Sequence, residues 1–203
     1  MQEDKKEPVK DTSIVYISNC FVGSDMTAHA FDSLVEKVNE KKPDVILFGG
    51  NLFGRHTNEV TIDKTLASIK KMKAALGIYM VEGSADSALV EEKKEKISGA
   101  GVHLLLDESA VLHNGLQLVG CRADGKTKKP MSYILSLINK EKPSIVLAGE
   151  TMEEKLKEEK KISLVLYPKK MTDTGNGGTS GVNQMFPRNV LASAKINFMQ
   201  IKK

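Results

Sequence analysis

The chain has 203 residues, of which 40% are hydrophobic and 28% are charged. A single globular domain of this size buries about 70% of its unfolded surface and needs neither a disulfide nor a metal to form a core. The 30 basic and 26 acidic residues give a formal charge of +4 and are mixed along the chain, and aromatic residues make up only 5%. We therefore expect solvated helix faces and no nucleic-acid surface.

The chain opens with a polar stretch and contains no apolar run long enough to span a membrane. We expect residues 1–12 to form a flexible polar leader and residues 13–203 to form one soluble domain. These features fit a cytoplasmic protein as well as the soluble part of a membrane-anchored or exported protein. Cys20 and Cys121 lack metal-ligand spacing, which favours two buried, small hydrophobic side chains.

Short apolar runs alternate with segments of helical spacing in the first half of the chain. The expected strands are residues 13–18, 45–48 and 78–81, and the expected helices are residues 30–41, 62–75 and 87–98. This alternation predicts parallel strand–helix–strand units with right-handed crossovers.

The second half begins with short strands at residues 102–106, 110–113 and 116–120, and Asn114-Gly115 predicts a hairpin turn between the last two. The expected helices 131–140 and 152–160 then alternate with strands 144–148 and 162–167, and residues 195–201 form the last strand. Residues 172–181 are rich in Gly, Ser, Thr and Asn, which predicts a loop. Their Gly-rich part lacks the lysine and helix of a phosphate-binding P-loop, so we expect a structural turn.

Ligands of open α/β sheets bind beyond the carboxyl ends of the strands, so the residues that follow each apolar run are informative. They are Asn19, Cys20 and Phe21, then Asn51, then Ser84, Ala85 and Asp86, then Gly149 and Glu150, and finally Lys169, Lys170 and Met171. No histidine is among them, and we expect His29, His56, His103 and His113 to be surface or turn residues. Asp86 precedes an expected helix, which predicts a helix N-cap.

At these positions the sequence resembles the calcineurin-like metallophosphoesterases, especially the small bacterial membrane-associated branch. The segment K-P-D-V-I-L-F-G-G-N-L-F is similar to the family's run that ends in Gly-Asp, and G-I-Y-M-V-E-G-S-A-D is similar to its G-N-H-D segment. The likeness continues through A-G-V-H-L-L-L-D-E-S and N-G-L-Q-L-V-G. It implies a four-layer αββα sandwich of two mixed β-sheets flanked by helices.

The family's metal ligands fall on residues of other types in this chain. Its opening Asp-x-His falls on Asn19 and Phe21, and its bridging aspartate falls on Asn51. Its Asn-His pair falls on Ser84 and Ala85, which leaves Asp86 as the retained residue. The histidine of a later strand falls on Gly149, and the closing Gly-His-Thr-His falls on residues 168–171, which include Lys169 and Met171.

These replacements remove the chemistry on which the family depends, which is two divalent ions such as manganese, iron or zinc. A bridging carboxylate offsets the repulsion between two such ions, whereas Asn51 offers only a neutral carbonyl and Phe21 offers no donor. Without the ions, nothing lowers the pKa of a bound water from 15.7 toward about 7. We therefore expect no catalytic residues, no bound metal and no cofactor.

The sequence thus predicts a pseudoenzyme that keeps the phosphoesterase fold as a binding or scaffolding module for a protein partner. One alternative is a hydrolase with residual or altered activity, with a single metal near Asp86 and Glu150 or with none. Another is a sensor that binds a small anion on Lys169 and Lys170. We further expect Phe21 and Met171 to fill the former metal cleft as an apolar plug. The sequence does not name the partner or the oligomeric state.

Overall fold

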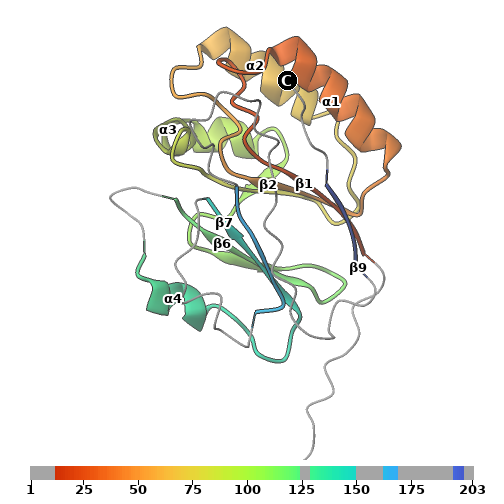
Figure 1. Ribbon diagram of the computed structural model, residues 1–203, viewed down its shortest axis with the longest axis vertical. Coiled ribbons are helices and arrows are strands. Elements are labelled where there is room, and N and C mark those ends of the chain that lie inside the picture. The colour runs from red at the N-terminus through yellow and green to blue at the C-terminus, as the bar shows by residue number, and fades with distance from the viewer. Residues whose placement is uncertain (1–11, 124–128, 150–161, 169–193, 199–203) are drawn as a thin grey trace, which may run out of the picture.

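The computed structural model describes residues 12–123, 129–149, 162–168 and, for the backbone only, 194–198. The first sheet has the strand order β4-β3-β2-β1-β9, of which β2, β1 and β9 are labelled in Figure 1. Its strands are β1 (Thr12–Ile17), β2 (Val45–Gly49), β3 (Ile78–Val81), β4 (Val102–Leu104) and β9 (Ala194–Phe198). All of their pairings are parallel, as the strand–helix–strand alternation predicts.

The second sheet has the order β5-β6-β7-β8 and is mixed. Its strands are β5 (Ser109–Val111), β6 (Gln117–Cys121), β7 (Ser144–Ala148) and β8 (Leu164–Leu166). Strands β5 and β6 form the antiparallel hairpin that Asn114-Gly115 predicts, and the other pairs are parallel. The hairpin turn is longer than two residues, because the Leu112 amide donates to the Leu116 carbonyl and only Gly115 has a positive φ, 87°.

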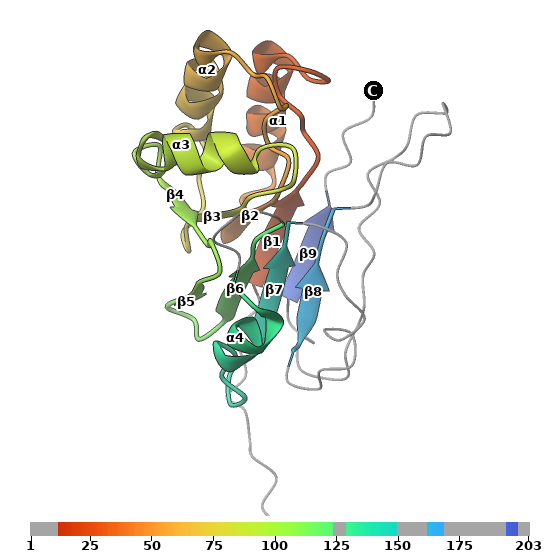
Figure 2. The same cartoon turned by 90° about the vertical axis from the view of Figure 1, so that its left-hand side faces the viewer.

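Helices α1 (Ala28–Glu40), α2 (Glu59–Ile69) and α3 (Ser87–Ser98) cover one side of the sandwich, and α4 (Met131–Ser136) covers the other (Figure 2). Each helix turns its apolar stripe to a sheet, as Phe31, Leu34, Val35 and Val38 do in α1. Thr27 and Asn58 cap α1 and α2 by accepting the amides of Ala30 and Thr61.

Alternation along each buried strand separates three apolar layers. In β1, Val15 and Ile17 face the cluster under α1 to α3, whereas Ile14 and Tyr16 face the cluster between the sheets. A third cluster lies under α4. The layers follow the order helix, sheet, sheet, helix, which confirms the predicted four-layer αββα fold class. Both sheets were expected to be mixed, but all described pairs of the first sheet are parallel, and only the second sheet mixes strand directions.

The element bounds differ from the sequence-based expectations by a few residues. Strand β1 already begins at Thr12, α2 begins at Glu59 instead of residue 62, and α4 ends at Ser136 instead of residue 140. The leader residues 1–11, the expected helix 152–160, the loop 172–181 and residues 199–201 of the last expected strand lie outside the described residues.

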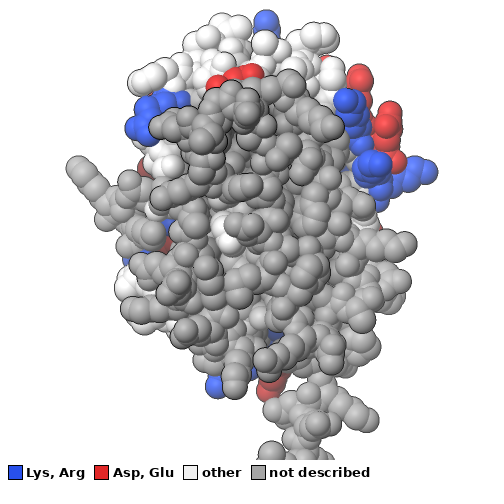
Figure 3. Space-filling model, in the orientation of Figure 1, with Lys and Arg blue, Asp and Glu red and all other residues white. Residues whose placement is uncertain are grey.

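Charges on the described surface are mixed. In the view of Figure 3, basic side chains stand beside acidic ones at the upper right margin, where α1 lies in Figure 1. Across α2 and α3, Lys96 pairs with Glu59 and Asp63, and Lys93 also pairs with Glu59. No helix among the described residues combines the length and apolar character needed to cross a bilayer.

Candidate functional site

The carboxyl ends of β1, β2, β3 and β7 meet at one edge of the sandwich. The Asn19 amide donates to the Gly50 carbonyl at 3.1 Å, which joins the residues that follow β1 and β2. The Ala85 amide donates to Asn51 Oδ1 at 3.0 Å, which adds the segment that follows β3. Gly149, after β7, lies against the Glu82 carbonyl. The structure thus brings together the predicted positions 19, 51, 85 and 149, whereas Glu150, Lys169 and Met171 lie outside the part it describes.

An amide bridge joins the two asparagines of this edge. The Ala85 amide needs an acceptor, so the Asn51 carboxamide turns its oxygen toward that amide. The Asn51 Nδ2 then points the other way and donates to Asn19 Oδ1 at 2.9 Å. Asn51 is 8% exposed. Both halves of its carboxamide are therefore used inside the protein.

The backbone around the bridge adopts the left-handed region. The φ angles are 55° at Asn19, 46° at Phe21 and 54° at Asn51. Asparagine tolerates this region better than most residues, whereas phenylalanine does not. Such conformations persist where surrounding contacts determine them, and at functional sites more than elsewhere.

Asp86 is buried and is held by backbone amides instead of capping α3. Its Oδ1 accepts the Gly83 amide at 2.7 Å and its Oδ2 accepts the Phe53 amide at 3.2 Å. It occupies the N-cap position of α3 but makes no side-chain cap hydrogen bond, so the predicted capping role is wrong. The Asp86 carboxylate bonds amides that follow β2 and β3, and it makes no cap bond to α3. Burial raises the pKa of Asp86 to about 6, although these amides oppose the shift.

Phe21 does not behave as the predicted plug. Its side chain is only half-buried and is not part of the apolar cluster under the helices. Its carbonyl accepts the amides of Ser24 and Asp25, which makes it the start of a turn. The buried residue at this strand end is instead Cys20, and burial raises the pKa of its thiol. Met171, the second residue of the expected plug, lies beyond the described ranges.

Gly149 has no room for a side chain. A Cβ added there would overlap the Glu82 carbonyl oxygen and would lie 2.8 Å from the Ala123 Cβ. Gly149 does not have a positive φ, so space alone requires glycine at this position. Ser84, by contrast, is exposed, and Ala85 is half-buried.

A buried ion pair at the same edge was missed by the sequence analysis. Arg122 Nε donates to Glu82 Oε1 at 2.8 Å, and Arg122 Nη2 donates to Glu82 Oε2 at 3.0 Å and to Glu91 Oε2 at 2.8 Å. Burial raises the pKa of Glu82, and the bonds from Arg122 partly offset this. The sequence did carry a signal for this ion pair, because Glu82 and Arg122 directly follow the buried strands β3 and β6, where a charged side chain needs a partner.

The four histidines are exposed, as predicted, and none lies at these strand ends. His103 stacks on Tyr79 with ring centroids 5.0 Å apart. Among the described residues, no three His, Cys, Asp or Glu side chains gather closely enough to hold a metal ion. Cys20 and Cys121 are both buried, also as predicted.

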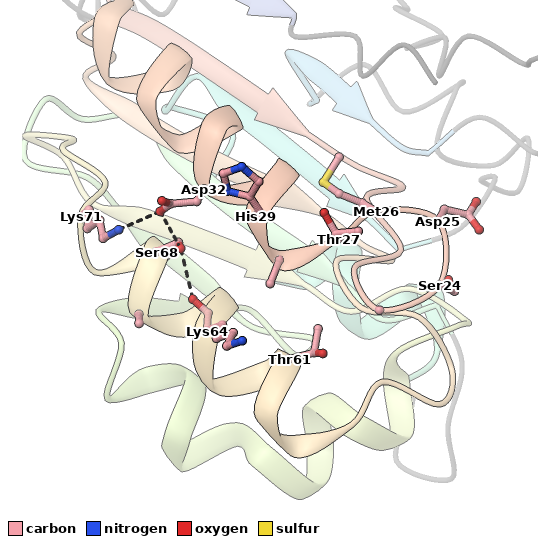
Figure 4. Close-up of a pocket in the computed structure, with 13 residues that line it drawn as sticks. Ser24, Asp25, Met26, Thr27, His29, Asp32, Thr61, Lys64, Ser68 and Lys71 are labelled. Carbon is pink, nitrogen blue, oxygen red and sulfur yellow. Dashed lines mark hydrogen bonds and ion pairs between the residues drawn. The ribbon is translucent and has the colours of Figure 1, made fainter.

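A groove of about 680 Å³ lies on the helical side of the sandwich, between α1 and α2 (Figure 4). Among its lining residues, Asp32 Oδ1 accepts bonds from Lys71 Nζ and Ser68 Oγ, each at 2.8 Å. One wall is the segment that follows the β1 end, from Gly23 to Ala28. Of the positions that the resemblance assigns to metal ligands, those that the structure describes do not line this groove.

Known proteins match the chain along most of its length. Two proteins described as uncharacterized metallophosphoesterases, from Helicobacter pylori strains 26695 and J99, are 25% identical over 189 residues and 24% identical over 188 residues. Each match covers 90% of this chain and 48% of the relative. This chain resembles the metallophosphoesterases. It spans about half the length of these curated relatives.

A solved structure also matches the chain in three dimensions. The crystal structure of the protein TT1561 of Thermus thermophilus superposes with a TM-score of 0.50 at 18% identity, over 68% of this chain and 67% of that chain. At this identity the likeness concerns the fold. No protein-family model matches the chain.

Proposed function

We propose that this chain is a metallophosphoesterase-like module that binds or scaffolds a protein partner and does not hydrolyse phosphoesters. The amide bridge between Asn19 and Asn51 carries the proposal. The resemblance assigns these two positions to aspartates, one of which bridges the metals. In this chain the neutral Asn51 carboxamide donates its N–H to Asn19 Oδ1 and accepts the Ala85 amide with its oxygen.

The other described residues at this edge do not fit a two-metal centre either. Asp86 keeps its carboxylate, but each oxygen accepts a backbone amide. Phe21, Ala85 and Gly149 supply no hard donor. Two divalent ions held close together need bridging negative charge, which this set lacks.

The two other functions have less support. A single-metal hydrolase would need the fully buried Asp86 to become accessible and Glu150 to join it, and Glu150 is outside the described residues. An anion sensor would depend on Lys169 and Lys170, which are outside them as well. The bacterial membrane-associated branch remains a proposal that rests on sequence resemblance.

Elemental analysis and phosphatase assays test the proposal. Purified protein should contain no stoichiometric manganese, iron or zinc, and should hydrolyse neither p-nitrophenyl phosphate nor its bis ester above background. Near-equimolar metal, together with turnover that a chelator abolishes, would overturn it. Added manganese in the assay controls for metal lost during purification.

A further inference from the structure

We propose that the former metal-binding edge is now a metal-free structural clasp that cannot take the ions back. The strand-tip clasp consists of Asn19, Asn51 and the backbone amide of Ala85, and it joins the residues that follow β1, β2 and β3. This inference rests on the proposed absence of the metals, and it states that hydrogen bonds between the strand ends take their place.

The clasp needs asparagine at position 51, not merely any polar residue. Asn51 must accept from the Ala85 amide and donate to Asn19 Oδ1 at the same time. A carboxylate can only accept, so an aspartate would keep the bond from the Ala85 amide but could not donate to Asn19 Oδ1. A bond between the two side chains would then require the Asn19 carboxamide to turn its Nδ2 toward position 51. The residue that restores the bridging ligand therefore disrupts the clasp in its present arrangement.

Backbone pairing extends past the sheet and holds the clasp residues in place. The Phe21 amide donates to the Asn51 carbonyl at 2.9 Å, and the Val22 amide donates to the Leu52 carbonyl at 2.8 Å. These bonds keep Asn19 and Asn51 in the left-handed region, which an unsupported loop would leave.

Asp86 reinforces the same connection. Its carboxylate joins the Gly83 amide, after β3, to the Phe53 amide, after β2. Because Asp86 is completely buried, a metal could reach it only if the segments around it moved apart. The retained family residue thus links two strand ends.

Gly149 closes the edge from the second sheet. The Glu82 carbonyl occupies the space into which a side chain at position 149 would project. A histidine there could enter only if β7 moved away from the end of β3. Restoring the family ligands one for one therefore meets a steric barrier as well as a chemical one.

The first test compares Asn51→Asp with Asn58→Asp in the full chain, with and without manganese. Asn58 caps α2 through its oxygen, and aspartate caps equally well, so this control should melt like the wild type. Asn51→Asp should lower the melting temperature by about 3–10 °C, and manganese should not restore it. A metal-dependent rise in Asn51→Asp, or a melting temperature equal to that of the control, would overturn the clasp.

The second test compares Gly149→Ala with Gly115→Ala. Gly115 has open space around it but a positive φ of 87°, so its substitution costs only backbone strain. Gly149→Ala should melt well below Gly115→Ala or fail to fold, because its methyl group overlaps backbone. Equal or higher stability of Gly149→Ala would refute the steric closure.

A measurement on the wild-type chain does not depend on any variant folding. Manganese broadens nuclear magnetic resonance signals near its binding site, so the side-chain amide signals of Asn19 and Asn51 should stay sharp during a titration. Selective broadening at one equivalent would show that the edge still binds metal. If Asn51→Asp matches its control while the protein remains inactive, the clasp is wrong and the proposed function stands. Chelator-sensitive turnover would instead refute the proposed function.

Discussion

Removal of Arg122 should reveal how strongly the two sheets depend on one buried ion pair. Its guanidinium, after β6, makes two bonds to Glu82, after β3, and one to Glu91. The Arg122 side chain is 8% exposed and that of Glu82 is fully buried. Arg122→Met keeps the apolar stem but leaves the Glu82 carboxylate buried without its cation. Loss of one partner of such a pair costs about 3–5 kcal/mol.

At about 2–4 °C per kcal/mol for a chain of this size, Arg122→Met should lower the melting temperature by about 6–20 °C in calorimetry. Lys96→Met is the matched control, because its partners Glu59 and Asp63 are exposed, and it should cost at most about 1 kcal/mol. The double variant Arg122→Met, Glu82→Leu should recover much of the loss, since it removes the unpaired charge.

The loss in Arg122→Met should also depend on pH. Burial already raises the pKa of Glu82, and the bonds from Arg122 hold it down. Without them the folded state binds the Glu82 proton still more tightly than the unfolded state does. The stability deficit should therefore be largest at neutral pH and should shrink as the pH falls. A loss below about 1 kcal/mol, or a deficit that does not change with pH, would mean that water reaches Glu82 and would refute the reasoning.

Three further predictions concern single buried groups. Burial raises the pKa of Asp86 from 3.8 to about 6, so its contribution to stability should fall by about 3 kcal/mol as the pH rises from about 4 to about 7. Urea unfolding across that range should show this slope in the wild type and lose it in Asp86→Asn; an unchanged slope would contradict it. Cys20 and Cys121 are buried, so a thiol reagent such as dithiobisnitrobenzoate should label them only after unfolding; rapid labelling of native protein would disprove their burial. Gln117 bonds the backbone at the end of α4 at 2.7 and 2.9 Å, so Gln117→Leu should cost about 1–3 kcal/mol in the same urea assay, and a neutral result would mean that water replaces both bonds.

The sequence predicted the layers of this protein because its patterns are local. Runs such as residues 45–48 and 145–148 are apolar throughout, which is typical of strands buried on both faces. The resemblance also assigned Asn19, Asn51 and Gly149 to ligand positions after strands. Asn19 and Asn51 lie together because they follow neighbouring parallel strands, whose carboxyl ends lie at one edge of the sheet.

Helix and strand bounds were less predictable, since tertiary contacts decide where an element ends. Met131 to Lys140 has helical spacing, yet the α4 helix ends at Ser136. Gln117, from β6, donates to the Leu137 carbonyl and accepts the Asn139 amide at that end. A side chain about twenty positions away cannot be read from the local pattern.

The sequence by itself predicted the fold class, and its resemblance to the metallophosphoesterases predicted that residues of other types stand at the family's ligand positions. Only the tertiary structure decided what those residues do. Asp86 looked like a helix cap, but amides that follow two strands bind it. Gly149 looked like a missing ligand, but the Glu82 carbonyl excludes any side chain there. The physical reason is that hydrogen-bond partners and free space at this edge come largely from segments about 30 or more residues apart, and folding alone brings these together.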